Sequence, residues 1–307
     1  MSRSALRMTG LLLPALAVVT LAMLYVGRAL PVGLGELIFA ASSGRSLEIY
    51  RMDVERRLMQ AITDNDFTDF APDWSPDGER IAFVSDRDGN REIYVMDALG
   101  RDVRRLTQHP DTDFAPVWSP DGRQIAFVSE RYGLTELMLV GVESGRLTRL
   151  TRNDSLDISP AWSPDGTRLA FVSDRDQRWD ANIYVMTLAT GAVEILQATP
   201  GDDLGPAWSP DGRYLIYTSD FGNMAIFLAN LETGRVVPLF SNNFTGFDTP
   251  AWSRDGRYIT YSATSGNSQM SLFMVDVQCL LRNDTCPSTV HQVTGQAALM
   301  INPRWKP

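Results

Sequence analysis

Residues 69–107 read DFAPDWSPDGERIAFVSDRDGNREIYVMDALGRDVRRLT and form one complete unit of a repeat. Within the unit, four runs rich in β-branched and aromatic residues alternate with turn residues. The SPDG of residues 75–78 is typical of a β-turn, because proline fixes φ at the second position and glycine ends the turn. The unit therefore predicts a four-stranded antiparallel sheet with strands at residues 70–74, 81–85, 92–97 and 103–107.

The unit recurs along the chain, and most copies open on a tryptophan. W-S-P-D-G begins at four tryptophans and W-S-R-D-G at a fifth, with spacings of 44, 44, 46 and 44 residues, and another tryptophan follows 53 residues later. Strand-rich repeats with a period of about 40 to 50 residues are typical of β-propeller blades. A ring gives every blade two neighbours to cover its apolar faces. These tryptophans are Trp74, Trp118, Trp162, Trp208, Trp252 and Trp305.

The two ends of the repeat region complement each other. Residues 37–53 match residues 81–97 without a gap, but no W-S-P-D-G precedes them. Residues 302–307, NPRWKP, echo the APDWSP of residues 71–76. We therefore predict an all-β fold, a six-bladed β-propeller of four-stranded blades over residues 36–307, whose C-terminal strand completes the first blade. Removal of the last ten residues is expected to open the ring.

The repeat P-x-W-S-P-D-G-x-x-I-A-F-x-S-D-R-D-G-x-x-x-I-Y-x-M-D resembles the TolB-like, WD40-like (PD40) propeller repeat. This repeat is also found in the propellers of prolyl-oligopeptidase-type enzymes. The resemblance covers roughly residues 36–307 and implies the six-bladed fold. TolB carries an additional N-terminal α/β domain, for which there is no room before Leu37, so a TolB-like propeller without that domain is expected. One propeller type serves many unrelated proteins, so the resemblance is specific for fold rather than function.

An apolar segment precedes the propeller. Residues 9–27 are 19 residues without a charge, and as a helix they span about 28 Å, close to the roughly 30 Å hydrocarbon core of a bilayer. Arg3 and Arg7 precede the segment, whereas Arg28 alone follows it before Glu36. This asymmetry favours an N-terminus inside the cell and a propeller outside.

These features predict four regions. Residues 1–8 are a cytoplasmic N-terminus, 9–27 a transmembrane anchor helix, 28–35 a short linker and 36–307 the propeller. A cleaved signal peptide, with a cleavage site near Gly27, is the alternative to the anchor. Because the resemblance implies a bacterial source, the expected location is the bacterial cytoplasmic membrane, with the propeller on its periplasmic or cell-surface side.

The overall charge excludes one class of partner. The formal net charge is −9 and the pI is near 4.8, which argues against nucleic acid, since nucleic-acid binding requires a basic patch. Acidity alone selects no other partner.

Cys279 and Cys286 are the two cysteines, and both lie in CLLRNDTC. We place this segment in an insertion between the third and fourth strands of the last blade. Because disulfides persist outside the cytosol, a local disulfide is expected; two free thiols are the alternative. The insertion is predicted to lie on the membrane-facing rim and to contact lipid headgroups or a membrane subunit.

An aspartate precedes each repeated tryptophan by four or five residues, and we expect these side chains to gather near one mouth of the channel. In one interpretation each aspartate stabilises a neighbouring turn or strand by hydrogen bonds. In the other, the carboxylates form a ring that binds a cation such as calcium or a basic peptide. Trp179 departs from the repeat period and is a candidate partner contact. The aspartates are Asp69, Asp113, Asp157, Asp203 and Asp248.

Sequence motifs of enzymes do not appear in the chain. His109 and His291 are the only histidines, and no G-x-S-x-G, H-E-x-x-H, C-x-x-C or Walker sequence occurs. We therefore expect no enzymatic function and no cofactor. The predicted function is a protein–protein interaction scaffold, an accessory subunit of a membrane protein complex. The alternative is a sensing propeller that binds a cation, glycan or peptide at the end of the channel where the aspartates are expected to gather.

Overall fold

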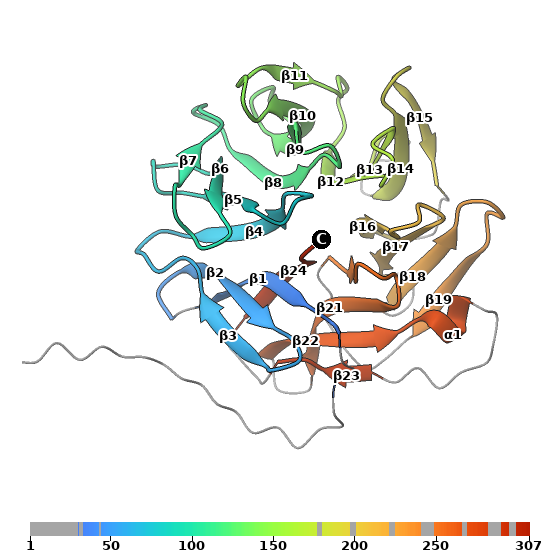
Figure 1. Ribbon diagram of the computed structural model, residues 1–307. Helices are drawn as coiled ribbons and strands as arrows, with labels where there is room; N and C mark the ends of the chain where they lie inside the picture. Colours follow the sequence, from blue (N-terminus) through green and yellow to red (C-terminus); the bar gives the residue numbers. More distant parts are fainter. Residues whose placement is uncertain are drawn as a thin grey trace, which may run out of the picture.

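The computed structural model describes residues 30, 33–42, 44–176, 180–196, 201–220, 225–240, 249–265, 269–281, 290–294 and 299–307. These residues form six four-stranded antiparallel sheets, and Figure 1 shows the sheets arranged as blades around a central axis. The predicted all-β, six-bladed propeller is therefore confirmed.

The first blade contains both ends of the propeller. Its strands, in sheet order, are β24 (Met300–Trp305), β1 (Glu36–Ser42), β2 (Leu47–Asp53) and β3 (Leu58–Ala61). Leu37 pairs with Trp305, and the amide of Lys306 donates to the carbonyl of Glu36 at 2.9 Å. The predicted closure by the C-terminal strand is confirmed, and the C-terminus lies near the centre of the ring in Figure 1.

The second to fourth blades each follow the predicted order of strands. The second contains β4 (Asp69–Trp74), β5 (Arg80–Ser85), β6 (Glu92–Asp97) and β7 (Arg104–Arg105). The third contains β8 (Asp113–Trp118), β9 (Gln124–Ser129), β10 (Glu136–Gly141) and β11 (Leu147–Arg149). The fourth contains β12 (Asp157–Trp162), β13 (Arg168–Ser173), β14 (Asn182–Thr187) and β15 (Ala192–Ile195).

The last two blades complete the ring. The fifth contains β16 (Asp203–Trp208), β17 (Tyr214–Ser219), β18 (Ala225–Asn230) and β19 (Val236–Phe240). The sixth contains β20 (Ala251–Trp252), β21 (Tyr258–Ser265), β22 (Gln269–Asp276) and β23 (Val290–Gln292). The single turn α1 (Gln278–Leu281) follows β22, within the predicted insertion before the last strand of this blade.

The repeated tryptophans pack between blades. Trp118, for example, contacts Ala82 and Val84 of the preceding blade. The Trp208 indole N–H donates to the carbonyl of Ala161 at 3.1 Å, and Trp252 makes the same bond to Ala207 at 3.2 Å. Each bond joins the innermost strands of adjacent blades, so the tryptophan repeat fixes the spacing of the ring.

The order of strands within a blade defines two rims. We name the strands of each blade A to D from the axis outward. The turns between A and B and the loops between C and D lie on one rim, called the A–B rim here; the B–C and D–A loops lie on the other, the B–C rim. Among the described residues, no helix is long and apolar enough to cross a membrane. The predicted anchor at 9–27 lies outside those residues.

Candidate functional site

The innermost strands surround a narrow channel. Each of the first five blades has a left-handed residue in strand A just before a proline, with φ of 48° at Ala71, 52° at Ala115, 52° at Ser159, 59° at Gly205 and 53° at Asn302. The strand A–strand B register shifts at this point. Such a bulge turns strand A locally and brings the prolines to the axis, where they line a cavity of about 130 Å³.

A wider cavity of about 340 Å³ opens at the A–B rim. It shares Pro160, Pro206 and Arg304 with the narrow cavity, so the two are continuous along the axis. Its wall is formed largely by the repeated tryptophans and the prolines near them. We call this concave surface the channel mouth.

One ion pair interrupts the apolar wall of the channel mouth. The guanidinium of Arg304, on β24, lies 3.4 Å from the carboxylate of Asp73, on β4. Asp73 also accepts a hydrogen bond of 2.7 Å from the amide of Trp118. Burial raises the pKa of Asp73 to about 6, although Arg304 and the amide oppose this shift. Asp73 and Arg304 both stand just before a repeated tryptophan, in the second and first blades. The same position is apolar in the third to sixth blades, at Val117, Ala161, Ala207 and Ala251.

Two further cations reach the channel mouth. Arg254 is exposed and lines the cavity, and no ion pair of Arg254 occurs within the described part of the chain. It occupies the turn position that is proline in the other W-S-x-D-G copies. Lys306 lies 3.2 Å from a carboxylate oxygen of Glu36 and 5.2 Å from the centre of the Trp74 ring. Among the described residues, Arg254 therefore supplies a positive charge that has no ion-pair partner.

Four of the five predicted aspartates begin strand A, toward the B–C rim. Asp69, Asp113, Asp157 and Asp203 are fully buried. The first three form ion pairs within their own blades, Arg87–Asp69 at 3.0 Å, Arg131–Asp113 at 2.6 Å and Arg175–Asp157 at 2.9 Å.

Asp113 also accepts a hydrogen bond of 2.6 Å from Ser129. Burial raises the pKa of Asp113, against the opposing effect of Ser129 and Arg131. These side chains thus have internal partners. In the described ranges no group of three or more His, Cys, Asp or Glu residues could hold a metal ion, and binding of calcium or a basic peptide stays a prediction.

Four other predicted site residues lie wholly or in part outside the described residues. Asp248, Trp179 and Cys286 lie outside the described residues, as does the side chain of Cys279. The predicted disulfide and the partner contact at Trp179 therefore stay predictions.

Sequence reasoning missed Asp73, Arg254 and Arg304. A signal was present, because each of these charged residues stands where other copies of the repeat carry alanine, valine or proline. Reading the repeat for its departures, as well as for its shared residues, would have found all three.

Comparison with known proteins agrees with this architecture. The family profile described as the TolB beta propeller domain (PD40) matches residues 31–113, 108–179 and 157–282. The chain therefore belongs to the family of TolB-like β-propeller proteins. Among curated proteins, none matches the sequence.

Solved structures of TolB proteins share the propeller. TolB from Acinetobacter baumannii superposes with a TM-score of 0.75 at 20% identity, over 89% of this chain and 67% of that chain. A putative TolB from Agrobacterium tumefaciens gives a TM-score of 0.69 at 21% identity, over 87% of this chain and 92% of that chain. At these identities the likeness shows the fold.

The prediction that the chain is not an enzyme was wrong, because solved structures with a similar propeller include enzymes. An oligogalacturonate lyase from Vibrio parahaemolyticus has a similar structure, with a TM-score of 0.55 at 17% identity over 84% of this chain and 71% of that chain. A propeller of this shape is thus compatible with catalysis. The likeness assigns no reaction to this chain, because at this identity it shows the fold alone.

Proposed function

We propose that this protein is a membrane-anchored, extracytoplasmic interaction module whose channel mouth docks an acidic segment of another subunit of a membrane complex. One observation carries the proposal: Arg254, which has no ion-pair partner among the described residues, presents its charge at the edge of a concave surface walled by tryptophan and proline. Buried aromatic and arginine side chains are the residue types that dominate binding energy at protein interfaces. An acidic side chain of the partner would pair with Arg254 while apolar neighbours cover the wall.

The dimensions of the channel mouth favour a segment over a whole domain. Its volume of about 340 Å³ is near the lower end of ligand pockets, which are about 300 to 1,000 Å³. A few residues of an extended chain or a loop fill such a volume. The rest of the partner would rest on the A–B turns around the channel mouth.

The path of the chain into the propeller supports a membrane partner. Leu34 packs against the core shared by the first and sixth blades, and its amide donates to Glu55 at 2.8 Å. The chain thus enters on the A–B rim. If residues 9–27 are the anchor, the eight residues of 28–35 span at most about 28 Å. The channel mouth would then face the bilayer, where membrane subunits are within reach.

The proposal is tested by purifying the tagged full chain from its native host in mild detergent. Arg254→Pro removes the charge and introduces the residue that the other W-S-x-D-G turns carry, and Arg254→Glu reverses the charge. Arg152→Glu is the matched control, because Arg152 is exposed and lies on the opposite rim. Protease treatment of spheroplasts, before and after their lysis, reports the side of the cytoplasmic membrane.

We expect a stoichiometric membrane subunit to accompany the wild type and Arg152→Glu, and its recovery to fall at least tenfold with both Arg254 variants. Equal recovery with all three variants would exclude the channel mouth as the docking surface. Digestion of the propeller only after the spheroplasts are lysed would place it in the cytoplasm and reject the topology.

A further inference from the structure

A second candidate site lies on the first blade, at the outer end of strand C near the B–C rim. In the second and third blades the first residue of strand C is a buried glutamate that pairs with an arginine of strand D. Arg105 lies 2.9 Å from Glu92, and Arg149 lies 2.7 Å from Glu136. Each arginine also donates through Nε to a backbone carbonyl two residues further on, at Thr107 and Thr151. A threonine hydroxyl binds the other carboxylate oxygen in both blades.

In three further blades neither of these two positions holds a charged residue. In the sixth blade Gln292 donates to Ser271 at 3.3 Å. In the fourth blade these positions hold Asn182 and Ile195, and in the fifth Ala225 and Pro238. Glutamate is therefore absent from strand C wherever arginine is absent from strand D in these blades.

The first blade breaks this rule. Glu48, the second residue of β2, stands where Glu92 and Glu136 stand in their blades, but Ala61 occupies the strand D position, where it pairs with Tyr50 just as Arg105 pairs with Tyr94. Glu48 is 1% exposed. One carboxylate oxygen, Oε1, accepts hydrogen bonds from Ser46 at 2.8 Å and from the amide of Asn65 at 3.3 Å.

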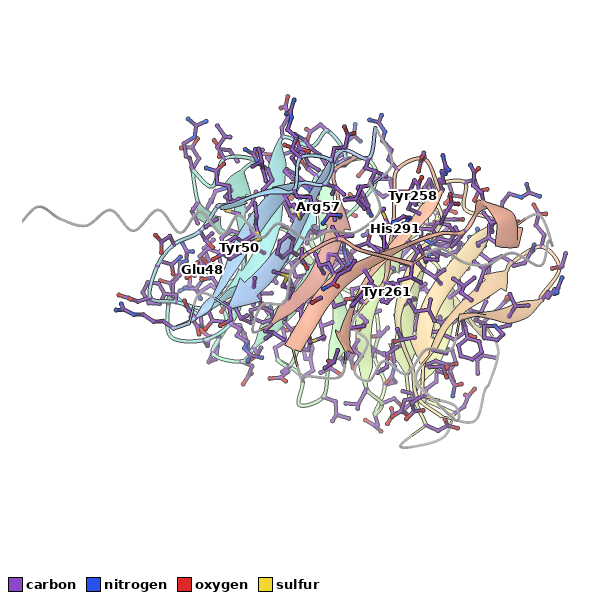
Figure 2. The ribbon with its side chains drawn as sticks, turned by 90° about the horizontal axis from the view of Figure 1, so that it is seen from below. Glu48, Tyr50, Arg57, Tyr258, Tyr261 and His291 are labelled. Atoms are coloured by element: carbon purple, nitrogen blue, oxygen red, sulfur yellow. The ribbon has the colours of Figure 1, made fainter. Side chains whose placement is uncertain are left out.

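The other carboxylate oxygen of Glu48, Oε2, is buried and has no hydrogen-bond partner among the described residues. No described cation forms an ion pair with Glu48 either. A buried charge without a partner is costly, so this oxygen is a place where an outside donor would gain most. Figure 2 shows Glu48 and Tyr50 beside one another on the first blade. The pKa of Tyr50 is raised by burial and then by the negative charges of Glu48 and Asp64, so the surroundings favour a cation.

We propose that Glu48, together with the space beside Ala61, binds a guanidinium group supplied from outside this chain. In the second and third blades a planar cation at this position donates to Oε1 of the glutamate and to a strand D carbonyl, while a threonine hydroxyl donates to Oε2; in the first blade neither of these two donors reaches Glu48. Thr63 stands where Thr107 and Thr151 supply that carbonyl. Ala61 is exposed, so the strand D position of the first blade can be reached from solvent.

The source of the guanidinium is an arginine side chain of a protein partner or a free guanidino compound; both share the chemistry that Glu48 recognises. The site is on the opposite rim from the channel mouth. The inference therefore stands whether or not the channel mouth docks a subunit.

The test uses ethylguanidinium chloride at millimolar concentrations and the full chain in detergent, with thermal unfolding as the measurement. Sodium chloride and ethylammonium chloride at the same ionic strength are the reference salts. Glu48→Gln removes the charge, and Ala61→Arg fills the site from within. Arg105→Ala creates a second site of the same kind in the second blade and serves as the positive control.

We expect ethylguanidinium to raise the melting temperature of the wild type above that in both reference salts, and Arg105→Ala to show a larger rise. Ala61→Arg should melt higher than the wild type without ligand and show no further rise. Glu48→Gln should show no rise in melting temperature. Its response to ethylguanidinium therefore measures the denaturing effect of the ligand, which is subtracted from the wild-type response. A wild-type response equal to that of Glu48→Gln, or reproduced by sodium chloride, would overturn the proposal, as would an undiminished response in Ala61→Arg.

A short blocked peptide, acetyl-Val-Arg-Val-amide, separates the two sources. Binding at least tenfold tighter than that of ethylguanidinium would assign the site to a protein arginine. Equal binding would assign it to a free guanidino compound. In both cases Glu48→Gln must abolish the binding; if it does not, the assignment to Glu48 fails.

Discussion

Replacing Trp305 with alanine should open the ring where the two ends of the chain meet. Trp305 is 9% exposed and packs against Ala251, Tyr258, Leu272 and Met274 of the sixth blade. Its indole N–H donates to the Thr260 hydroxyl at 3.0 Å. It is thus the side chain that ties β24, and with it the first blade, to the last one.

The expected cost can be worked from burial. A tryptophan buries about 150 to 250 Å², which at about 25 cal/mol per Å² gives about 4 to 6 kcal/mol as an upper bound. Measured Trp→Ala changes in cores cost about 3 to 5 kcal/mol. We therefore expect the free energy of unfolding to fall by about 3 to 5 kcal/mol. Thr260→Val, which removes only the acceptor, should cost about 1 kcal/mol.

The assay is urea unfolding of the full chain followed by circular dichroism, combined with hydrogen exchange of the β1 amides. Trp162→Ala is the control, because the four strands of its blade are consecutive in the chain, whereas β24 is held to β1 only by pairing between the two ends of the propeller. Both variants should be less stable, but only Trp305→Ala should speed exchange in β1, whose Ala40 pairs with Ile301 of β24. A cost below about 1 kcal/mol, or equal β1 exchange in both variants, would refute the role of Trp305 in closure.

Three further changes test other parts of the fold. Arg131→Ala leaves Asp113 buried without its cation and should cost about 3 to 5 kcal/mol in urea unfolding; Arg131→Ala/Asp113→Asn should recover part of that cost. Because folding raises the pKa of Asp73 from 3.8 to about 6, the native state binds this proton more tightly. The unfolding free energy should therefore fall between about pH 4 and pH 6, by at most about 3 kcal/mol, and Asp73→Asn should flatten that slope. Gly205→Ala brings a Cβ to 2.6 Å from Cγ2 of Thr249 and should lower the melting temperature, whereas adding Thr249→Ser should restore part of the loss, because the backbone Cα of residue 249 still lies 3.1 Å from that Cβ; no loss in the single variant would contradict the contact.

The fold could be predicted because its determinants are local and repeated. The W-S-P-D-G turn needs only its own residues: the amide of Gly78, at φ 68°, donates to the Ser75 carbonyl at 2.8 Å. The tryptophan period then sets the number of blades. Ring closure followed from matching NPRWKP at residues 302–307 with the repeat, and its register, Leu37 with Trp305, agrees with that match.

The candidate site could not be predicted in the same way, because its residues meet only after the ring closes. Asp73 and Arg304 lie at opposite ends of the propeller sequence, and their separation of 3.4 Å depends on the angle between adjacent blades. The buried aspartates show the same limit at shorter range. Asp69 and Arg87 are 18 residues apart, and their pairing requires the register of β4 with β5.

Internal repetition also turns each blade into a control for the others. An arrangement present in several blades, such as the indole bond to a neighbouring carbonyl, is explained by the scaffold. A residue that breaks the arrangement is not explained by the scaffold, and where its charge is buried without an ion-pair partner, as at Glu48, it also lowers stability. Arg254 at the channel mouth and Glu48 on the first blade are two such departures, one cationic and exposed, the other anionic and buried. Their opposite charges and opposite rims suit two different ligands, so a variant of one should leave binding at the other unchanged.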